Sequence, residues 1–281
     1  MPVPQDAVTS PSRLSENQIS EFQDLGVTVI RQCVDTHGLA ELSRAIEEDI
    51  RSPGPFYHGY KSEEGSGRFH GNLRLWEHDS TFRKFCFSSP LPQIAAGFLE
   101  SQKVNLLYDQ LFVKEPGTLN RTRWHNDQPY WPIRGWQVMS FWIALDPVSR
   151  DSGALEFIAG SHRWDRWFQP KAFGDTAGQD EYVANSDYEP MPDIQNHRGD
   201  YEIVSWSLEP GDAYVFHGLT VHGSGGNQHQ SRRRRGYAIR YTGDDVVYDT
   251  RVGTNTGLCS ETHHDGMILD SDRYPVVWPA S

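Results

Sequence analysis

The hydrophobic pattern changes its period part-way along the chain. Before about residue 100, apolar positions recur every three to four residues, which is typical of amphipathic helices. Ser15 followed by Gln18 is typical of a capping box that opens the first helix, and Gly26 marks its end. The pattern predicts helices over residues 15–26, 38–51, 80–86 and 91–100, and one strand over residues 27–30.

From about residue 103 the chain consists of short runs of β-branched and aromatic residues separated by Gly, Pro, Asp and Asn. Such a series is typical of an antiparallel sandwich or jelly roll. We therefore predict a mainly β fold with flanking helices. Strands are expected over residues 104–113, 123–130, 138–145, 154–158, 203–208, 213–217, 220–222 and 237–241.

The pattern also predicts the domain organisation. A single domain is expected over residues 14–281, after a flexible tail over residues 1–13 that is rich in Pro, Ser and Thr. The jelly-roll core is expected at about residues 103–245, with a polar insertion at about 164–200 that suits a surface loop or lid. The glycine-rich stretch 52–72 is predicted to be a long loop, which in compact domains often covers or binds a ligand.

Composition and charge narrow the class of protein. The 281-residue chain has a formal net charge of −12 and a mean hydropathy of −0.64, which argues against nonspecific nucleic-acid binding. No apolar run approaches the roughly 20 residues that span a bilayer, and Met1–Arg13 lacks the apolar centre of a signal peptide. Three widely spaced cysteines without CxxC fit a reducing compartment. We expect a cytoplasmic monomer or homodimer that binds a small molecule, and neither nucleic acid nor membrane.

His125 and Asp127 form a candidate metal-binding pair. Residues two apart on a strand point to the same face, so this imidazole and this carboxylate would aim at one point. Together these two ligand types suit a divalent transition metal. Two ligands do not hold a catalytic metal, and a downstream segment offers two candidates for the third, His217 and His222.

Several motifs taken together resemble the phytanoyl-CoA dioxygenase family of iron(II)- and 2-oxoglutarate-dependent dioxygenases. The resemblance covers residues 14–245 and rests on His-x-Asp at His125, on the distal His222 and on Arg233, eleven residues further on. Further matching stretches are Ser152-Gly153-Ala154-Leu155, Ala159-Gly160-Ser161-His162, Gly211-Asp212 and His222-Gly223-Ser224-Gly225. The family's fold is a double-stranded β-helix, a cupin-like jelly roll, which agrees with the predicted strands.

The resemblance implies roles for individual residues. They are His125, Asp127 and His222 as catalytic iron ligands, Arg233 and Ser224 as partners of the distal carboxylate of 2-oxoglutarate, and Trp142 as a wall of the cosubstrate pocket. Gln110 and Lys114 lie on the strand before the metal strand, and Gln110 is taken as a further cosubstrate contact. Arg235 shares a strand face with Arg233, so a register slip of two residues would exchange them.

The chemistry of such a site explains these choices. Two histidines and one carboxylate on one face of iron leave three positions, which suffice for 2-oxoglutarate, bound through two oxygens, and for dioxygen. Asp127 favours oxygenation over halogenation, because related halogenases have a small residue in its place. We predict hydroxylation of an unactivated C–H bond of a small organic metabolite, with release of succinate and carbon dioxide.

Other functions are compatible with the same sequence. The same iron chemistry gives desaturation, epoxidation or cyclisation in an alternative within the enzyme class. A non-catalytic, cupin-like small-molecule binding protein is the alternative from another class, and the complete set of ligands argues against it. A zinc hydrolase is disfavoured, because no general base is evident beside the metal.

Overall fold

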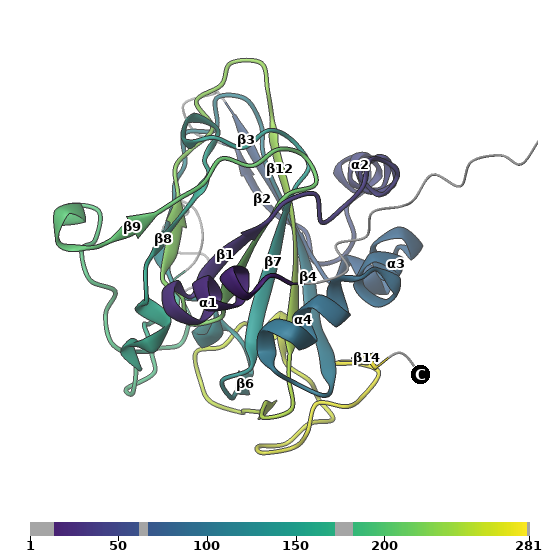
Figure 1. The fold of residues 1–281 in the computed structure, drawn as a ribbon, viewed down its shortest axis with the longest axis vertical. Coiled ribbons are helices and arrows are strands. Elements are labelled where there is room, and N and C mark those ends of the chain that lie inside the picture. Colours follow the sequence, from purple (N-terminus) through teal and green to yellow (C-terminus); the bar gives the residue numbers. More distant parts are fainter. Residues whose placement is uncertain (1–13, 62–66, 172–181, 280–281) are drawn as a thin grey trace, which may run out of the picture.

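Two antiparallel β-sheets pack against each other at the centre of the protein (Figure 1). The computed structural model describes residues 14–61, 67–171 and 182–279. Within these residues the major sheet has eight strands in the order β1-β10-β7-β12-β4-β3-β2, with β14 beside β4. The minor sheet has four described strands in the order β5-β11-β8-β9. The arrangement confirms the predicted double-stranded β-helix with flanking helices.

The bounds of the elements are as follows. The major sheet contains β1 (Val27–Ile30), β2 (His58–Lys61), β3 (Arg68–Leu73), β4 (Val104–Lys114), β7 (Val138–Ala144), β10 (Ala213–His217), β12 (Arg234–Thr242) and β14 (Val276–Trp278). The minor sheet contains β5 (Thr122–His125), β8 (Leu155–Ile158), β9 (Ile203–Val204) and β11 (His222–Ser224), and a small separate pair is formed by β6 (Ile133–Arg134) and β13 (Val247–Tyr248). The helices are α1 (Glu16–Leu25), α2 (Thr36–Arg51), α3 (Ser80–Ser88) and α4 (Leu91–Leu99).

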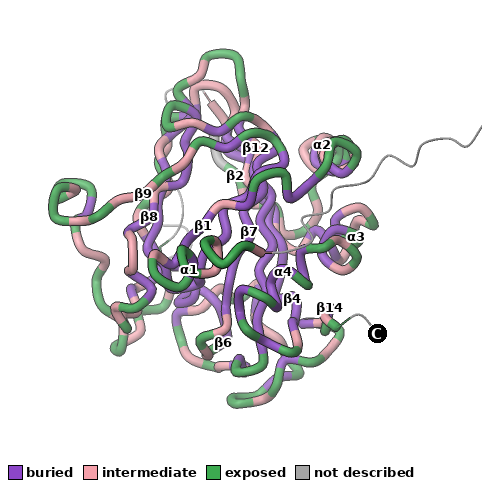
Figure 2. Tube along the Cα trace, in the orientation of Figure 1, coloured by how far each residue is buried: buried purple, intermediate pink, exposed green. Residues whose placement is uncertain are grey.

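The helices cover the face of the major sheet that points away from the minor sheet. In Figure 1, α2, α3 and α4 lie on one side of the major sheet, and β8 and β9 lie on the other. The buried segments of the tube in Figure 2 are concentrated in the strands, whereas the helices alternate between buried and exposed positions. Phe22 of α1 packs against Phe98 of α4 with ring centroids 5.1 Å apart, which joins α1 to this layer.

Strand β12 separates two environments. Tyr237 and Tyr241 face the helices and belong to the hydrophobic core on that side. Ala238 packs with residues of the minor sheet, and Arg234 and Arg240 line a cavity on the same side of the strand. Because side chains alternate along a strand, the space between the sheets receives every second residue of β12. The even-numbered charged residues of β12, Arg234 and Arg240, therefore face the space between the two sheets.

Local sequence signals located the first helices well. The Ser15 hydroxyl accepts a hydrogen bond from the Gln18 backbone N–H at 3.2 Å, and the Gln18 side chain accepts one from the Ser15 N–H at 3.1 Å. Gly26 ends α1 with φ of 77°, a conformation that glycine adopts without steric strain. Helix α2 begins earlier than predicted, at Thr36, because the Asp35 carboxylate caps its first turn. The predicted capping box and both helix ends are confirmed to within two residues.

The prediction of a long loop over residues 52–72 is wrong for much of its length. Strands β2 and β3 form a hairpin there, and β3 pairs with β4 in the major sheet. A Cβ at Gly71 would overlap the ring of His58 on the opposite strand. Glycine in this hairpin therefore makes room for a neighbouring side chain and does not mark a loop. Residues 62–66, between the two strands, lie outside the described part of the chain.

The remaining segments frame the two sheets. The predicted N-terminal tail, residues 1–13, lies outside the described residues, as do residues 172–181 of the predicted insertion. After residue 245 the chain forms β13, which pairs with β6, and β14, which pairs with β4 in the major sheet. None of the helices in the described ranges is both long enough and apolar enough to cross a bilayer.

Close packing between β12 and β7 yields a test of this fold. A Cβ at Gly236 would overlap the Trp142 ring, so we expect Gly236→Ala to lower the free energy of unfolding by about 1–3 kcal/mol through overpacking. Denaturant titration followed by circular dichroism measures the change. Gly199→Ala is the matched control, because no atom lies within 4 Å of a Cβ at that exposed site, and its effect should stay within about 0.5 kcal/mol. Equal effects at the two sites would contradict the packing described here.

Candidate active site

His125 and His222 face each other across two neighbouring strands of the minor sheet. His125 is the last residue of β5, His222 is the first residue of β11, and the two are register partners in this antiparallel pair. Their ring centroids lie 4.2 Å apart. Directly opposed residues on one face of a sheet are close enough to interact, so this register brings both imidazoles to one place.

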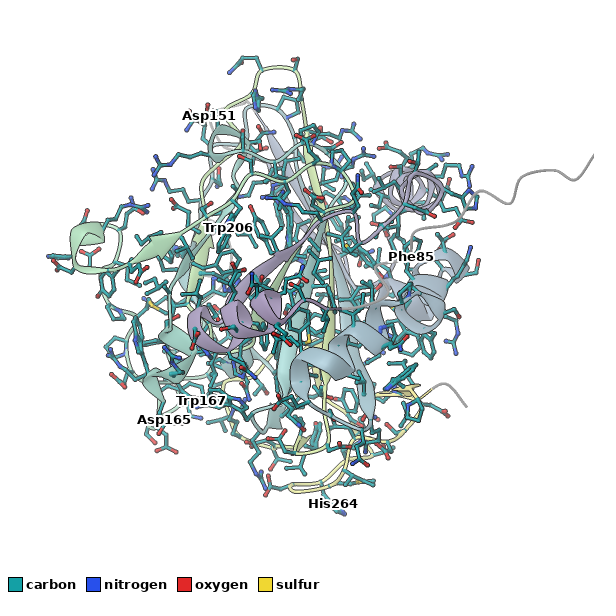
Figure 3. The ribbon with its side chains drawn as sticks, in the orientation of Figure 1. Phe85, Asp151, Asp165, Trp167, Trp206 and His264 are labelled. Carbon is teal, nitrogen blue, oxygen red and sulfur yellow. The ribbon has the colours of Figure 1, made fainter. Side chains whose placement is uncertain are left out.

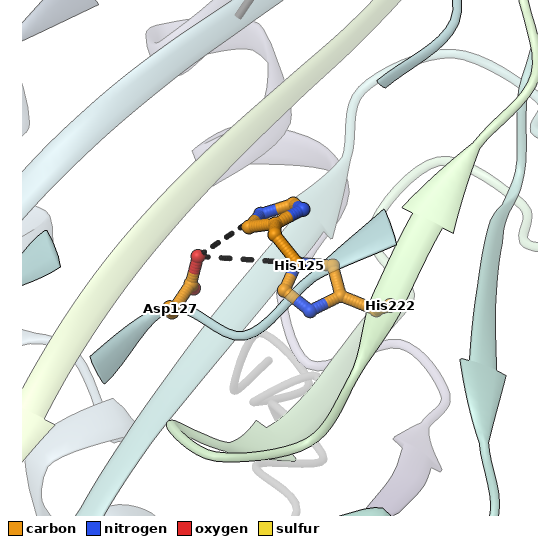
Figure 4. Close-up of side chains that lie close together, drawn as sticks. All are labelled: His125, Asp127 and His222. Carbon is orange, nitrogen blue, oxygen red and sulfur yellow. Dashed lines mark ion pairs between the residues drawn. The ribbon is translucent and has the colours of Figure 1, made fainter. Parts of the chain in front are cut away.

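Asp127 reaches the two histidines from a turn. Strand β5 ends at His125, and Asp127 adopts a right-handed helical conformation at the start of a 3-10 turn, η2 (Gln128–Tyr130). Its Oδ1 lies 3.3 Å from Nε2 of His125 and 3.9 Å from Nε2 of His222 (Figure 4). The prediction of a continuous strand over residues 123–130 is therefore wrong, although the imidazole and the carboxylate converge as expected.

The three side chains fit a divalent metal ion. Their ligand atoms all lie within 4.8 Å of one another, and all three residues are buried. Nδ1 of His125 lies 2.8 Å from a backbone carbonyl oxygen, and Nδ1 of His222 lies 3.0 Å from another. An Nδ1–H that donates to a carbonyl fixes the tautomer whose Nε2 lone pair binds metal. Oδ2 of Asp127 is buried and has no hydrogen-bond partner among the described residues, as suits a carboxylate placed for a cation.

Electrostatics set the protonation states that metal binding requires. Burial alone would raise the pKa of Asp127, but the adjacent imidazoles of His125 and His222 and the positive charge of Arg240 hold this pKa below its usual range. Burial, reinforced by the neighbouring His125, lowers the pKa of His222 to about 4. At neutral pH the site therefore presents an ionised carboxylate at Asp127 and a neutral imidazole at His222, the forms that act as ligands.

A cavity of about 710 Å³ opens beside the three residues, and both sheets contribute to its walls. His125, Asp127 and His222 all line it. Many of its other walls are aromatic or aliphatic, and among them are Phe56, Leu73, Tyr108, Phe112, Tyr130, Trp131 and Phe216. A volume of this size suits a small organic ligand. Tyr130 and Trp131 follow Asp127 by three and four residues in the sequence, and the structure places both in this wall.

Basic and hydroxyl groups gather at one end of the cavity, where β4, β11 and β12 meet. The ammonium group of Lys114 donates to the Ser224 hydroxyl at 2.9 Å and to the Gly225 carbonyl at 2.7 Å. Arg234 is the register partner of Lys114, is buried, and has its guanidinium carbon 5.2 Å from a Trp142 ring centre. We call Lys114, Trp142, Ser224 and Arg234 the basic pocket, and all four line the cavity.

The charges of the basic pocket affect one another. Burial, together with the positive charge of Arg234, holds the pKa of Lys114 well below its usual value. The Lys114 ammonium has hydroxyl and carbonyl acceptors and no carboxylate partner among the described residues. A buried cation whose described partners are all neutral is a place where an anionic ligand gains strongly from binding.

The two arginines selected from the sequence lie outside the cavity. Arg233 has Nη1 2.7 Å from the Glu47 carboxylate, and Arg235 has Nη2 2.7 Å from the Asp146 carboxylate. Strand β12 begins at Arg234 and alternation along the strand turns Arg234 inward, with its two neighbours outward. The structure thus brings Arg234 to the cavity in place of Arg233 or Arg235. A run of four arginines contains no signal that distinguishes the inward-facing one.

Two further sequence predictions concern Gln110 and His217. Gln110 lines the cavity, and its Nε2 lies 3.4 Å from Nε2 of His58. His217 is buried with Nε2 2.7 Å from the Trp136 carbonyl oxygen and Nδ1 3.1 Å from the Leu219 N–H. Both ring nitrogens of His217 are therefore used in backbone contacts, which leaves His222 as the histidine beside His125.

The cluster His263-His264-Asp265 does not converge. His263 is buried, and its Nδ1 lies within hydrogen-bonding distance of the Ser260 hydroxyl oxygen, at 2.7 Å. Asp265 instead forms an ion pair with Arg134 at 2.6 Å. Figure 3 shows His264 at the outer edge of the molecule, away from the sheets. Among the groups that the structure describes, His125, Asp127 and His222 form the one set with metal-ligand spacing.

Sequence reasoning missed the contribution of the C-terminal segment. Residues 250–258 line the cavity, and Arg251 fastens this segment by donating to the carbonyls of Gln128 at 3.0 Å and Trp131 at 2.6 Å. The segment has little periodicity, so the hydrophobic pattern contained no signal for it. Arg240 also lines the cavity, and strand alternation from Arg234 was the signal that would have found it.

Comparison with known proteins agrees with this geometry. The family model of phytanoyl-CoA dioxygenase (PhyH) matches residues 22–236 of the chain. The peroxisomal phytanoyl-CoA dioxygenase of Rattus norvegicus is 24% identical in a match that covers 86% of this chain and 72% of the rat protein. Multifunctional dioxygenase prhA of Penicillium brasilianum is 24% identical in a match that covers 82% of this chain and 73% of that protein.

Solved structures share the fold. The non-heme alpha ketoglutarate dependent carbocyclase SnoK from nogalamycin biosynthesis superposes with a TM-score of 0.75, at 19% identity, over 96% of this chain and 98% of SnoK. The epimerase SnoN, in complex with Fe3+, alpha ketoglutarate and nogalamycin RO, superposes with a TM-score of 0.71, at 17% identity, over 93% of this chain and 98% of SnoN. The family model spans most of the chain, and the chain therefore belongs to the phytanoyl-CoA dioxygenase family of iron(II)- and 2-oxoglutarate-dependent dioxygenases.

Proposed function

We propose that the protein hydroxylates an unactivated C–H bond of a small organic metabolite, with iron(II) held by His125, Asp127 and His222. The observation that carries this proposal is the convergence of the three buried ligands in the wall of a cavity that also contains the basic pocket. Two imidazoles and one carboxylate leave three positions on iron. Iron bound there with 2-oxoglutarate supplies the oxidation, in which one oxygen atom of dioxygen enters the product hydroxyl, the other enters succinate, and carbon dioxide is released.

The basic pocket is proposed to bind the distal carboxylate of 2-oxoglutarate. The planar guanidinium of Arg234 matches a carboxylate with two parallel hydrogen bonds, and its charge is permanent. The Ser224 hydroxyl and the Lys114 ammonium lie beside it and are already held in place by their mutual hydrogen bond. The guanidinium of Arg234 lies over the Trp142 ring, which also lines the cavity. We therefore assign to Arg234 the role that the sequence suggested for Arg233.

The rest of the cavity is proposed to hold the organic substrate. Tyr108, Tyr130 and Trp131 provide aromatic walls close to the ligand set, and the Trp131 indole N–H donates to the Tyr108 hydroxyl at 2.8 Å. Walls fixed in this way position a C–H bond and exclude water from the reacting atoms. The carboxylate of Asp127 occupies the place that a halide would need, which supports hydroxylation over halogenation.

A cytoplasmic location is part of the proposal. Cys33, Cys86 and Cys259 are all free thiols, and thiols of this kind persist in a reducing compartment. Small molecules are the proposed partners, as in the dioxygenase family to which the chain belongs.

Removal of the carboxylate ligand tests the metal assignment. Anaerobic addition of iron(II) and 2-oxoglutarate to the native protein should produce a visible metal-to-ligand charge-transfer band. Asp127→Asn should weaken iron binding by more than the roughly 10–100-fold that is typical of losing an outer contact of a metal site. Asp151→Asn, at an exposed edge position (Figure 3), is the matched control and should titrate like the native protein. Native iron affinity in Asp127→Asn would contradict the assignment.

Two adjacent arginines test the cosubstrate pocket. Arg234→Met should raise the 2-oxoglutarate concentration for half-maximal charge-transfer absorbance at least about tenfold, since a hydrogen-bonded charge contributes roughly 1.5–3 kcal/mol. Arg233→Met removes the same charge one residue earlier and should leave this concentration within about twofold, because Arg233 pairs with Glu47 outside the cavity. The opposite pattern would return the role to Arg233.

A further inference from the structure

Arg240 is a second buried arginine in the cavity, on the same face of β12 as Arg234. The residue is only 3% exposed. Its guanidinium carbon lies 4.6 Å from the ring centre of Tyr108 and 5.7 Å from that of Phe112. Aromatic faces attract a cation, but they do not supply the oxygen acceptors to which guanidinium N–H groups bond.

Arg240 has fewer acceptors than other arginines in this part of the protein. Its Nε and Nη1 have no hydrogen-bond partner among the residues described. The carboxylate that it faces is Asp127, whose Oδ2 lies 3.9 Å from Nη2, beyond hydrogen-bonding distance. By contrast, Arg235 donates two hydrogen bonds to Asp146, at 3.0 and 2.7 Å, and Arg251 donates to three backbone carbonyls. Arg240 therefore carries a buried charge that its protein surroundings leave incompletely satisfied.

Such a group reduces the stability of a folded protein. Burial of an ionised side chain without acceptors is unfavourable, and residues that break this rule cluster at functional sites. Asp127 compensates Arg240 only in part, because the same carboxylate is a proposed ligand of the metal. A ligand that supplied oxygen acceptors to Arg240 would remove this cost when it binds.

Among the described residues that line the cavity, basic groups outnumber acidic ones. Asp127 is the one carboxylate among the described residues that line it, whereas the basic ones are Lys114, Arg121, Arg234, Arg240 and Arg251. The chain has a net charge of −12, so this local excess is not a consequence of composition. With iron(II) and 2-oxoglutarate bound, the charges of these two cancel, and Arg240 shares the Asp127 carboxylate with the metal.

We propose that Arg240 binds a carboxylate of the organic substrate, which makes the substrate class a carboxylic acid with an apolar or aromatic body. This inference rests on the function proposed above. A planar carboxylate matches the guanidinium fork. It also supplies oxygen acceptors, which Nε and Nη1 of Arg240 lack among the described residues.

The position of Arg240 also restricts the site of oxidation. Its Nη2 lies 3.9 Å from Asp127 and its guanidinium lies against Tyr108, on the wall of the cavity that adjoins the ligand set. A carboxylate held there places the carbon atoms next to it beside the metal ligands. The C–H bond that reacts therefore lies within a few bonds of the carboxylate. The aromatic wall formed with Tyr130 and Trp131 receives the apolar body.

A carboxylate at Arg240 has two possible sources, the substrate and the inner carboxylate of 2-oxoglutarate, and binding measurements separate them. Protein loaded anaerobically with iron(II) and saturating 2-oxoglutarate is titrated by calorimetry with phenylacetate, 3-phenylpropionate and 4-phenylbutyrate. The three corresponding amides, which have nearly the same shape and no charge, are titrated in parallel. The variants are Arg240→Met, which removes the charge, Arg240→Lys, which keeps it without the fork, and Arg233→Met as a control outside the cavity.

The native protein and Arg233→Met should bind at least one acid about tenfold or more tightly than its amide, as expected when a charged hydrogen bond is lost. Arg240→Met should abolish this preference, and Arg240→Lys should retain part of it. Absence of any preference for acid over amide in the native protein, or its survival in Arg240→Met, would overturn the proposal. Circular dichroism melts of each variant establish that it is folded, and Arg240→Lys carries the test should Arg240→Met not fold.

A second readout separates this inference from the function on which it rests. The charge-transfer titration with 2-oxoglutarate is repeated on each variant, and Arg240→Met should match the native protein. A variant that loses 2-oxoglutarate affinity but keeps its preference for acids would assign Arg240 to the cosubstrate, against the proposal. A native protein without the band would refute the proposed function, whereas the calorimetric comparison of acid with amide would still report on Arg240.

Discussion

The antiparallel register of β5 and β11 is the constraint on which the site depends. It sets His125 directly opposite His222, and the turn that follows β5 returns Asp127 to both imidazoles. A slip of one residue in either strand would turn one histidine to the other face of the sheet. Neighbouring elements hold this register, because β8 pairs with the opposite edge of β11 and the Phe216 ring lies 4.8 Å from that of His222. The helices act at a distance, by covering the outer face of the major sheet.

Charge is the second principle that organises the cavity. The protein buries Lys114, Arg234 and Arg240 in the walls of one cavity, where ionised groups are unfavourable unless they are hydrogen-bonded. Proteins retain such buried charges where a bound ligand supplies hydrogen-bond partners and the opposite charge. The protein without ligand is less stable as a result. Lys114 and Arg234 belong to the basic pocket and Arg240 faces Asp127, which suggests one anion at the basic pocket and another at Arg240. A substrate and a cosubstrate bound in this way would meet at the iron with their reacting groups between them.

Sequence reasoning succeeded where a local signal determined the structure. The capping box at Ser15 and the strand series from residue 104 predicted the helix position and the fold class, and the His-x-Asp motif with His222 named the three residues that converge in the structure. It failed where the structure depends on which face of a strand a residue occupies, or on contacts with distant parts of the chain. Alternation along β12 turns Arg234 toward the cavity and Arg233 away from it. Which of the two faces inward depends on the pairing of β12 with β4, and a run of four arginines does not reveal it. The hairpin within residues 52–72 and the wall at residues 250–258 depend on contacts with distant strands.

The central claim is that His125, Asp127 and His222 bind iron(II), with 2-oxoglutarate reaching from the metal to the basic pocket. Crystals grown anaerobically with iron(II) and 2-oxoglutarate, measured on both sides of the iron absorption edge, test it most directly. We predict one anomalous peak at about 2.0–2.2 Å from Nε2 of both histidines and from one oxygen of Asp127, and the distal carboxylate of 2-oxoglutarate against Arg234. An anomalous peak elsewhere, or a distal carboxylate bound at Arg233, would contradict the account.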